Sequence, residues 1–216
     1  MHYAPGTDPC PLPFDPFKSC TVPRPIGWLS TVSADGKVNL APFSQWQNLT
    51  FDPPMVMFAA NQLTGRRKDT VVNAEETGWF VWNMATYDLR EAVNISASEF
   101  PADVNEFEEA GVTMADCVDA PGPRVAESPC HFECRYLSTH RLAGGSERAW
   151  VDVVYGRVER IHVRGDVVTP EGKLDIPRIV PIARLGYYDY TAVREVFEMR
   201  IPNASAETLD GLEGKA

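Results

Sequence analysis

The chain has 216 residues, of which 44% are hydrophobic and 23% are charged, proportions that are ordinary for a soluble globular domain. This length suits one good core and is short for two. Thirty acidic against twenty basic residues give a net charge of −10, which disfavours nucleic acid and anionic lipid as partners. No apolar run approaches the roughly 20 residues of a membrane-spanning helix. The N-terminus does not resemble a signal peptide, so we expect a cytoplasmic protein.

The two ends of the chain differ in composition from its middle. Residues 1–25 are rich in proline, which disfavours helix and central strand, so they are predicted to form an extended arm. Residues 203–216 are polar and are predicted to form a frayed tail. Residues 26–202 show no clear linker and are predicted to form a single domain.

Short strand-like runs dominate this domain, at residues 26–33, 37–43, 54–60, 78–84, 131–138 and 149–163. Asp35-Gly36 predicts a two-residue hairpin turn, and Gly144-Gly145 predicts another turn. Many strands, few helices and one core indicate a closed or nearly closed antiparallel barrel with peripheral helices.

Three helices are predicted between the strands, at about residues 69–76, 86–96 and 103–111. The first begins at Asp69 or Thr70. Thr86 can cap the second, and Asp103-x-x-Glu106 has the pattern of a capping box for the third.

The five cysteines are an odd number in an expected cytosolic chain, so a disulfide framework is not predicted. In a strand, Cys130, Phe132 and Cys134 share one face, and His131 and Glu133 share the other. No second Cys/His pair has suitable spacing for a closed zinc site. We therefore predict no metal site and buried structural cysteines, with thiol redox chemistry as the alternative.

Two features raise the question of an anionic, flat ligand. Residues 37–48 form a strand-like return leg in which Asn39, Ala41, Ser44, Gln45 and Asn48 are small or polar. Such a leg suits either the wet face of a plain hairpin or a surface approached by a flat, polar-edged molecule. Arg66-Arg67-Lys68 is a dense basic cluster directly before a predicted helix start. Such a cluster is either solvated charge or part of a phosphate site.

Several segments, taken in order, resemble the flavin reductase-like family, and its longer flavoredoxin-like branch most of all. They are PRPIGWLST, NLAPFSQWQN, DPPMVMF, KDT at 68–70, GWFVWNM, NEFEEAGVT, PRVAESPCHFEC, GRVERIHV and ARLGYYDY at 183–190. The resemblance covers roughly residues 17–202. It implies a mainly β fold, a split antiparallel β-barrel of Greek-key type with peripheral helices, which forms a homodimer and holds FMN at the subunit interface.

The resemblance also implies which residues bind FMN. The phosphate is assigned to Lys68, Asp69 and Thr70, helped by Ser30 and Thr31. The isoalloxazine is assigned to Asn39, Ala41, Pro42, Phe43, Ser44, Gln45 and Trp46, with Asn48 nearby. Core packing is the alternative for Trp46. Arg24 could reach the phosphate or tie down the N-terminal arm, and we favour the arm.

Two functions follow from the resemblance. The first is an NAD(P)H:flavin oxidoreductase, with NADH or NADPH as reductant, that supplies reduced flavin or electrons to a partner such as a monooxygenase. The second is a flavoredoxin-like electron carrier that does not oxidise NAD(P)H. Short flavin reductases often carry a histidine about five residues before a glycine that looks like Gly156, and here Val151 and Asp152 stand there. His162 is expected to be structural, so no catalytic residue is predicted. A barrel that has lost the flavin is a third possibility.

Overall fold

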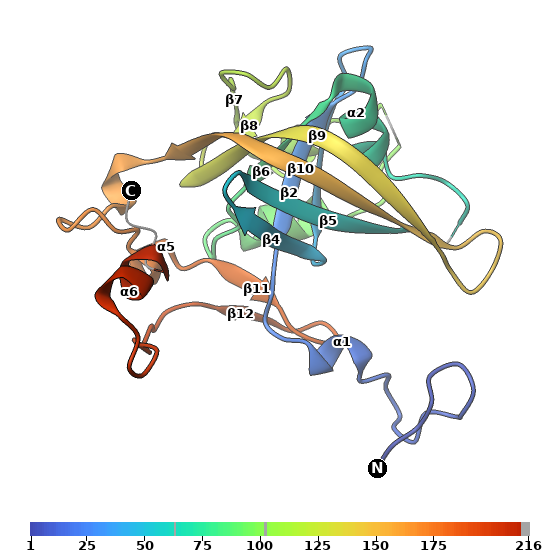
Figure 1. The fold of residues 1–216 in the computed structure, drawn as a ribbon. Coiled ribbons are helices and arrows are strands. Elements are labelled where there is room, and N and C mark those ends of the chain that lie inside the picture. The colour runs from blue at the N-terminus through green and yellow to red at the C-terminus, as the bar shows by residue number, and fades with distance from the viewer. Residues whose placement is uncertain (63, 102, 213–216) are drawn as a thin grey trace.

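One large curved sheet dominates the structure (Figure 1). The computed structural model describes residues 1–62, 64–101 and 103–212. The strands of this sheet are β2 (Gly27–Val32), β3 (Val38–Phe43), β4 (Trp46–Phe51), β5 (Pro54–Gln62), β6 (Trp79–Asn83), β9 (Cys130–Ala143) and β10 (Trp150–Val163). They lie in the order β3-β2-β6-β9-β10-β5-β4, and every pairing is antiparallel. The helix α2 (Asp69–Thr77) carries the chain from β5 across to β6.

The six predicted strands are confirmed, whereas β4 was not predicted. β4 is short and exposed along most of its length, so it lacks the apolar run that would mark it as a strand. The turn between β2 and β3 falls where it was predicted but is longer than two residues. Ser33 N donates to Lys37 O, and Gly36 closes the turn at φ 86°, a geometry typical of a three-residue hairpin loop.

The two edges of the sheet approach each other, so the sheet curls toward a barrel. Only Ser44 and Gln45 separate β3 from β4, and the rings of Phe43 and Phe58 lie 5.0 Å apart between β3 and β5. Register shifts in the β9–β10 pairing bend this long hairpin. At one of them, a Cβ on Gly156 would lie 2.4 Å from Phe80 Cζ, so glycine is required for the sheet to bend around that ring.

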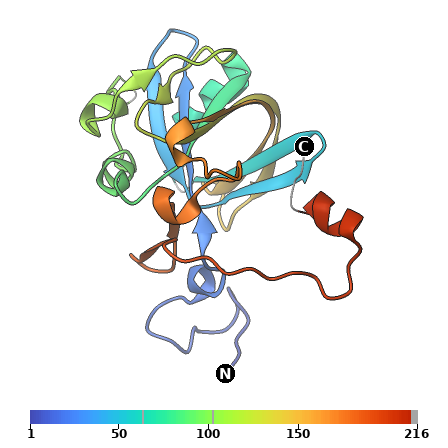
Figure 2. The same cartoon turned by 90° about the vertical axis from the view of Figure 1, so that its left-hand side faces the viewer.

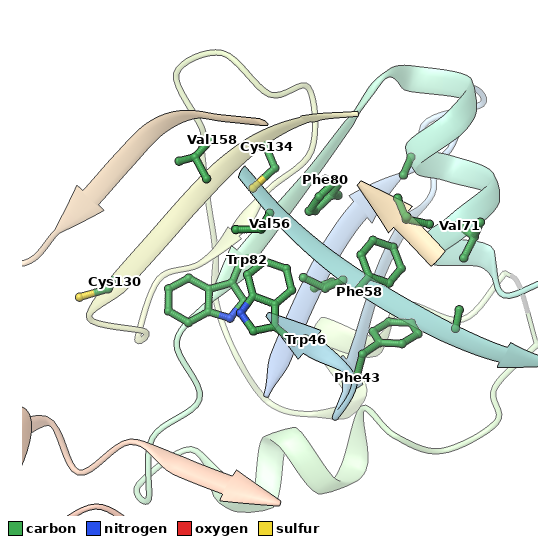
Figure 3. Close-up of a cluster of buried hydrophobic side chains, with 14 residues drawn as sticks. Phe43, Trp46, Val56, Phe58, Val71, Phe80, Trp82, Cys130, Cys134 and Val158 are labelled. Carbon is green, nitrogen blue, oxygen red and sulfur yellow. The ribbon is translucent and has the colours of Figure 1, made fainter. Parts of the chain in front are cut away.

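Aromatic rings fill the inside of the curved sheet (Figure 3). The indoles of Trp46 and Trp82 are stacked at 5.8 Å, and the rings of Phe58 and Phe80 meet edge to face at 5.3 Å. Cys130 and Cys134 are buried in the same cluster, and Phe132 packs against it, which confirms the predicted apolar stripe.

A second core lies on the outer face of β2 and β3. Trp28 and Leu40 pack there against α3 (Arg90–Ile95) and α4 (Glu106–Glu109). Trp28 Nε1 donates to Ser96 Oγ at 2.9 Å. β2 is therefore buried on both faces, which explains its mostly apolar sequence.

The predicted first helix is confirmed by α2, but the predicted starts of the other two helices are wrong. Thr86 forms an isolated bridge with Pro181 instead of a cap, and α3 begins four residues later. α4 is a single turn capped by Asn105, whose side chain accepts from Phe107 N at 3.1 Å. Asn105 lies closer to that turn than Asp103, and its short side chain is an equally good cap.

The N-terminal arm is anchored by a small second sheet. This sheet consists of β1 (Arg24–Pro25), β11 (Ile182–Arg184) and β12 (Tyr190–Ala192), in the order β1-β11-β12. Arg24 donates to the carbonyls of Lys18, Thr21 and Leu185, so it ties the arm to the body as expected. The prediction of no helix in the arm is wrong at α1 (Phe17–Cys20), a single turn that contains no proline.

The other elements are short: β7 (Met114–Ala115), β8 (Arg124–Val125), the 3₁₀ turn η1 (Gly165–Val167) and α5 (Ile176–Ile179). After β12 the chain runs away from the barrel to α6 (Ala206–Leu212), as Figure 2 shows. The described part of the predicted tail is thus partly helical instead of frayed, and residues 213–216 lie outside the described residues. Among the described helices, none has the length and apolar character needed to span a membrane.

Candidate functional site

A cavity of about 260 Å³ opens where β3, the end of β5 and the start of α2 come together. The segment 96–100 after α3 also lines it. Seven residues that the sequence assigned to FMN line this cavity: Asn39, Ala41, Pro42, Phe43, Lys68, Asp69 and Thr70. The fold therefore brings the NLAPF and KDT segments to one place, although about thirty residues separate them in the chain.

The start of α2 gives the cavity a positive end. Lys68 is the N-cap residue, and its carbonyl accepts from the amides of Val71 and Val72. The first amides of a helix have no partner within the helix and carry the positive end of its dipole, which makes them donors for an anion. The Lys68 ammonium lies 3.8 Å from Glu99 Oε1, and that carboxylate is 89% exposed. Such a loose, solvated pair is weak, so Lys68 is available to a ligand.

Buried hydrogen bonds hold α2 on the sheet. Asn39 Nδ2 of β3 donates to Thr70 Oγ1 at 2.9 Å, and Asn73 Nδ2 donates to Thr31 Oγ1 of β2 at 3.1 Å. All four residues are buried. Each bond would leave two unsatisfied polar groups if it were broken, so together they fix the position of α2 relative to the cavity wall.

The loop before α2 is held from the side of β5. Gln62 is only 2% exposed. With its amide turned so that both of its ends are satisfied, it accepts from Lys68 N at 2.9 Å and donates to Arg66 O. The Arg66 guanidinium contacts Asp69 at 3.2 Å on the surface. Of the three adjacent bases, Arg66 thus neutralises the acidic residue of the first helical turn.

Arg67 is held within the protein. Its guanidinium forms a bidentate pair with Glu75, at 2.7 Å for both hydrogen bonds, and its Nε donates to Asp152 Oδ2 at 3.2 Å. The hydrogen bonds from Arg67 lower the pKa of Glu75. Burial acts to raise the pKa of Asp152, but hydrogen bonds from Arg141, Trp150 and Arg67 outweigh it and lower that pKa. Both carboxylates therefore stay ionised beside Arg67.

An acidic residue, Glu106, also lines the cavity. Glu106 accepts from Leu40 N at 3.2 Å. Burial is the main cause that raises the pKa of Glu106, and the charge of Asp69 adds to it. A raised pKa means that Glu106 holds its proton more readily than an exposed glutamate does, which weakens its repulsion of an anion in the cavity.

The other residues assigned to FMN lie outside this cavity. Ser30 is fully buried and donates to Pro123 O. Trp46 belongs to the inner core, 5% exposed and stacked on Trp82. Ser44 and Gln45 are half-buried at the bend between β3 and β4, and Asn48 is exposed on β4. Thr31 is occupied by Asn73, as described above. Direct contact of these six residues with a flavin stays a prediction.

The sequence reasoning missed part of the lining, chiefly Asn61, Gln62, Thr64, Ser96, Ser98, Glu99, Phe100 and Glu106. The small polar run that follows α3 was the only local signal for the segment 96–100, because nothing in the sequence indicates that it faces β3. Glu106 was predicted to belong to a capping box, and that role gave no reason to expect it in the cavity.

His162 and Asp152, the second of which stands where related short reductases carry a histidine, both have partners within the protein. His162 Nε2 lies 2.6 Å from Glu133 Oε1. The Glu133 carboxylate also accepts hydrogen bonds from the amides of residues 118–120. His162 therefore has a structural partner, as expected. Asp152 is bound to Arg67, Arg141 and Trp150.

Comparison with known proteins gives the family. Residues 19–192 match the flavin reductase like domain. An uncharacterized protein of Aquifex aeolicus is 36% identical over 77% of this chain and 84% of its own length. Component B of nitrilotriacetate monooxygenase from Bacillus cereus has a similar structure, with a TM-score of 0.84 and 27% identity over 92% of this chain and 98% of that one.

Flavoredoxin of Desulfovibrio vulgaris shares the fold, with a TM-score of 0.72 and 16% identity over 94% of this chain and 99% of its own. The curved seven-stranded sheet is thus a split barrel, as the sequence predicted, with the cavity at its rim beside α2. The chain belongs to the flavin reductase-like domain family.

Proposed function

We propose that this protein binds FMN and acts as an NAD(P)H:flavin oxidoreductase. The observation that carries the proposal is the convergence of Lys68 and the first amides of α2 with the NLAPF strand at one cavity. A phosphate needs a cation and N–H donors, and a flavin ring needs a flat wall with small side chains. The cavity has both, in a protein of the flavin reductase-like family.

The residues present fit FMN as follows. Lys68 and the amides of Asp69 and Thr70 would hold the phosphate, and the isoalloxazine would lie along Ala41, Pro42 and the following bend. The Asp69 carboxylate is paired with Arg66, so its repulsion of a phosphate is reduced. Trp46 would support the ring from the core.

When bound, FMN supplies an acceptor for the hydride of a nicotinamide, and a proton from solvent completes the two-electron reduction. This chain's own residues bind and orient the reacting molecules. Ala41 is small enough to let a ring approach the backbone, and the segment 96–100 lines the same cavity.

We also propose that the functional unit is a homodimer. After β12 the chain carries exposed apolar side chains, among them Val196 at 62%, Phe197 at 84% and Met199 at 83% exposure. They lie on an extended segment that leaves the barrel (Figure 2). Large apolar side chains exposed on one segment favour a protein partner, and a second copy would add its surface to a cavity that is small for a whole flavin. Light scattering that returned a 24.0 kDa monomer with full FMN occupancy would refute this.

The reduced flavin could serve in either of two ways. The similarity to component B of nitrilotriacetate monooxygenase supports a partner monooxygenase that uses the reduced flavin. The second candidate function is an electron carrier that a partner protein reduces, and the structural role of Asp152 at the position expected for a histidine favours it.

Anaerobic stopped-flow mixing of the FMN-loaded protein with NADH and with NADPH tests the proposal. An oxidoreductase should bleach the flavin absorbance with one or both nicotinamides in a saturable way. A carrier should show no bleaching with either and should still cycle with dithionite and oxygen. A purified protein that binds no FMN would exclude both functions.

A further inference from the structure

A fully buried carboxylate is bonded to the basic loop, residues 66–68, that precedes α2 at the cavity. The Asp152 side chain is 0% exposed, and both of its oxygens accept hydrogen bonds. Oδ1 accepts from Arg141 Nε at 2.7 Å, and Oδ2 accepts from Arg141 Nη2 at 3.0 Å and from Trp150 Nε1 at 3.2 Å. The remaining bond, from Arg67 Nε to Oδ2 at 3.2 Å, links this group on β10 to the loop before α2.

Arg67 joins the loop before α2 to both β10 and α2. One side of its guanidinium meets Asp152 on β10, and its two terminal nitrogens meet Glu75 on α2. The guanidinium is planar, so contacts along two of its edges define its orientation. The backbone of residue 67 is therefore held, and residue 67 directly precedes Lys68 and the first amides of α2.

The loop is thus held on two sides. Gln62 of β5 bonds the backbone of Arg66 and Lys68, and Asp152 of β10 holds the side chain of Arg67. β5 and β10 are paired in the sheet, with Asp152 opposite Ala60. The paired strands β5 and β10 therefore position the loop that carries the Lys68 ammonium and the amide donors.

We propose that Asp152 is a positioning residue for the phosphate of the flavin. Through Arg67 it fixes the loop that presents Lys68 and the first amides of α2, and it does not touch the flavin. This proposal rests on the proposed function, because it concerns the same cavity. It gives a functional role to a carboxylate that would otherwise only satisfy two arginines.

The test compares FMN with riboflavin, which lacks the phosphate. Asp152→Asn keeps the size of the side chain and removes its charge, so the grip on Arg67 weakens. The FMN Kd should rise by about tenfold, the lower end of the loss seen when a residue that orients a metal ligand is removed, while the riboflavin Kd stays at the wild-type value. An equal loss for both ligands, or no loss for either, would overturn the proposal.

Glu159→Gln is the matched control, because Glu159 is also an acid on β10 and pairs with Arg157 on the surface, at 2.6 Å. It should leave both Kd values unchanged. If Asp152→Asn does not fold, Glu75→Gln replaces it, since Glu75 holds the other side of Arg67 and is 27% exposed. The preference for FMN over riboflavin should fall in that variant too, and an unchanged preference would refute the role of Arg67.

A double-mutant cycle separates positioning from general destabilisation. In a Lys68→Ala background, Asp152→Asn should cost less FMN affinity than in the wild type, because one of the groups that it positions is gone. Fully additive losses would contradict the proposal. A wild-type protein that binds FMN no better than riboflavin would instead remove the phosphate site itself, so the two failures are distinguishable.

Discussion

Inside the barrel, the rings of Phe43, Phe58 and Phe80 pack against one another. The rim beside α2 is instead held by polar contacts, the hydrogen bond between Asn39 and Thr70 and the charged pair of Arg67 with Asp152. The interior gains stability from apolar area removed from water, which is large and does not depend on direction. The rim gains little net stability from buried polar pairs, but its geometry is strict because a misplaced partner leaves a group unsatisfied. In this protein the interior therefore provides stability, and the rim provides a shaped binding site.

The largest expected effect is in the interior. Phe80→Ala should lower the free energy of unfolding by about 3–5 kcal/mol, because it leaves a cavity where a ring 1% exposed was packed. Urea unfolding followed by tryptophan fluorescence measures this. Phe51→Ala, at a ring 89% exposed on β4, is the control and should change little. A small loss for Phe80→Ala would mean that the interior is not the source of stability.

A smaller effect, on binding alone, is expected at the rim. Lys68→Ala should weaken FMN binding by about 1.5–3 kcal/mol, the usual contribution of a charge-assisted hydrogen bond, and should leave riboflavin binding and the free energy of unfolding nearly unchanged. Calorimetric titration with both ligands measures this. Equal affinities of the wild type for the two ligands would contradict the phosphate assignment.

The buried carboxylate of Glu133 holds the loop at residues 118–120 through the amides of that loop, and this contact depends on pH. Burial acts to raise the pKa of Glu133, but hydrogen bonds from the amides of residues 118–120 and from His162 outweigh it and bring the pKa to about 2. The stability that these bonds give is present above the ordinary pKa of 4.5 and is lost as the pH falls from there through about 2.

Glu133→Gln should therefore be less stable than the wild type at neutral pH, by on the order of 1 kcal/mol. The two proteins should converge as the pH falls through that window. Thermal unfolding over a pH series measures the difference, with the exposed Glu91→Gln as control. A constant difference at all pH values would show that the charge of Glu133 is not what pins the loop.

The smallest effect is expected on the outer surface. Lys37 pairs with Asp35 at 3.1 Å, and both side chains are more than half exposed, at 55% and 63%. Lys37→Ala should change the free energy of unfolding by about 0.5 kcal/mol or less and should leave FMN affinity unchanged. It is the matched control for Lys68→Ala, since both remove one lysine. A loss of FMN affinity here would mean that net charge, and not the geometry of the rim, governs binding.

Much of the fold could be predicted from the sequence because the signals are local. Apolar runs marked six strands of the sheet, and the Lys68-Asp69-Thr70 step marked the start of α2. The exposed strand β4 lacked such a signal. The helix capped by Asn105 was placed two residues too early, because Asp103 offered a stronger pattern than the residue that the tertiary structure uses.

By itself, the sequence determined a mainly β fold, the family, and the NLAPF and KDT segments, because each can be read from local runs of residues and from their order along the chain. Only the tertiary structure decided that Trp46 belongs to the core, that the segment 96–100 faces β3, and that Asp152 reaches Arg67 from another strand. These contacts join residues far apart in the chain. Their positions depend on how the sheet curls, and no local pattern of side chains encodes that curvature.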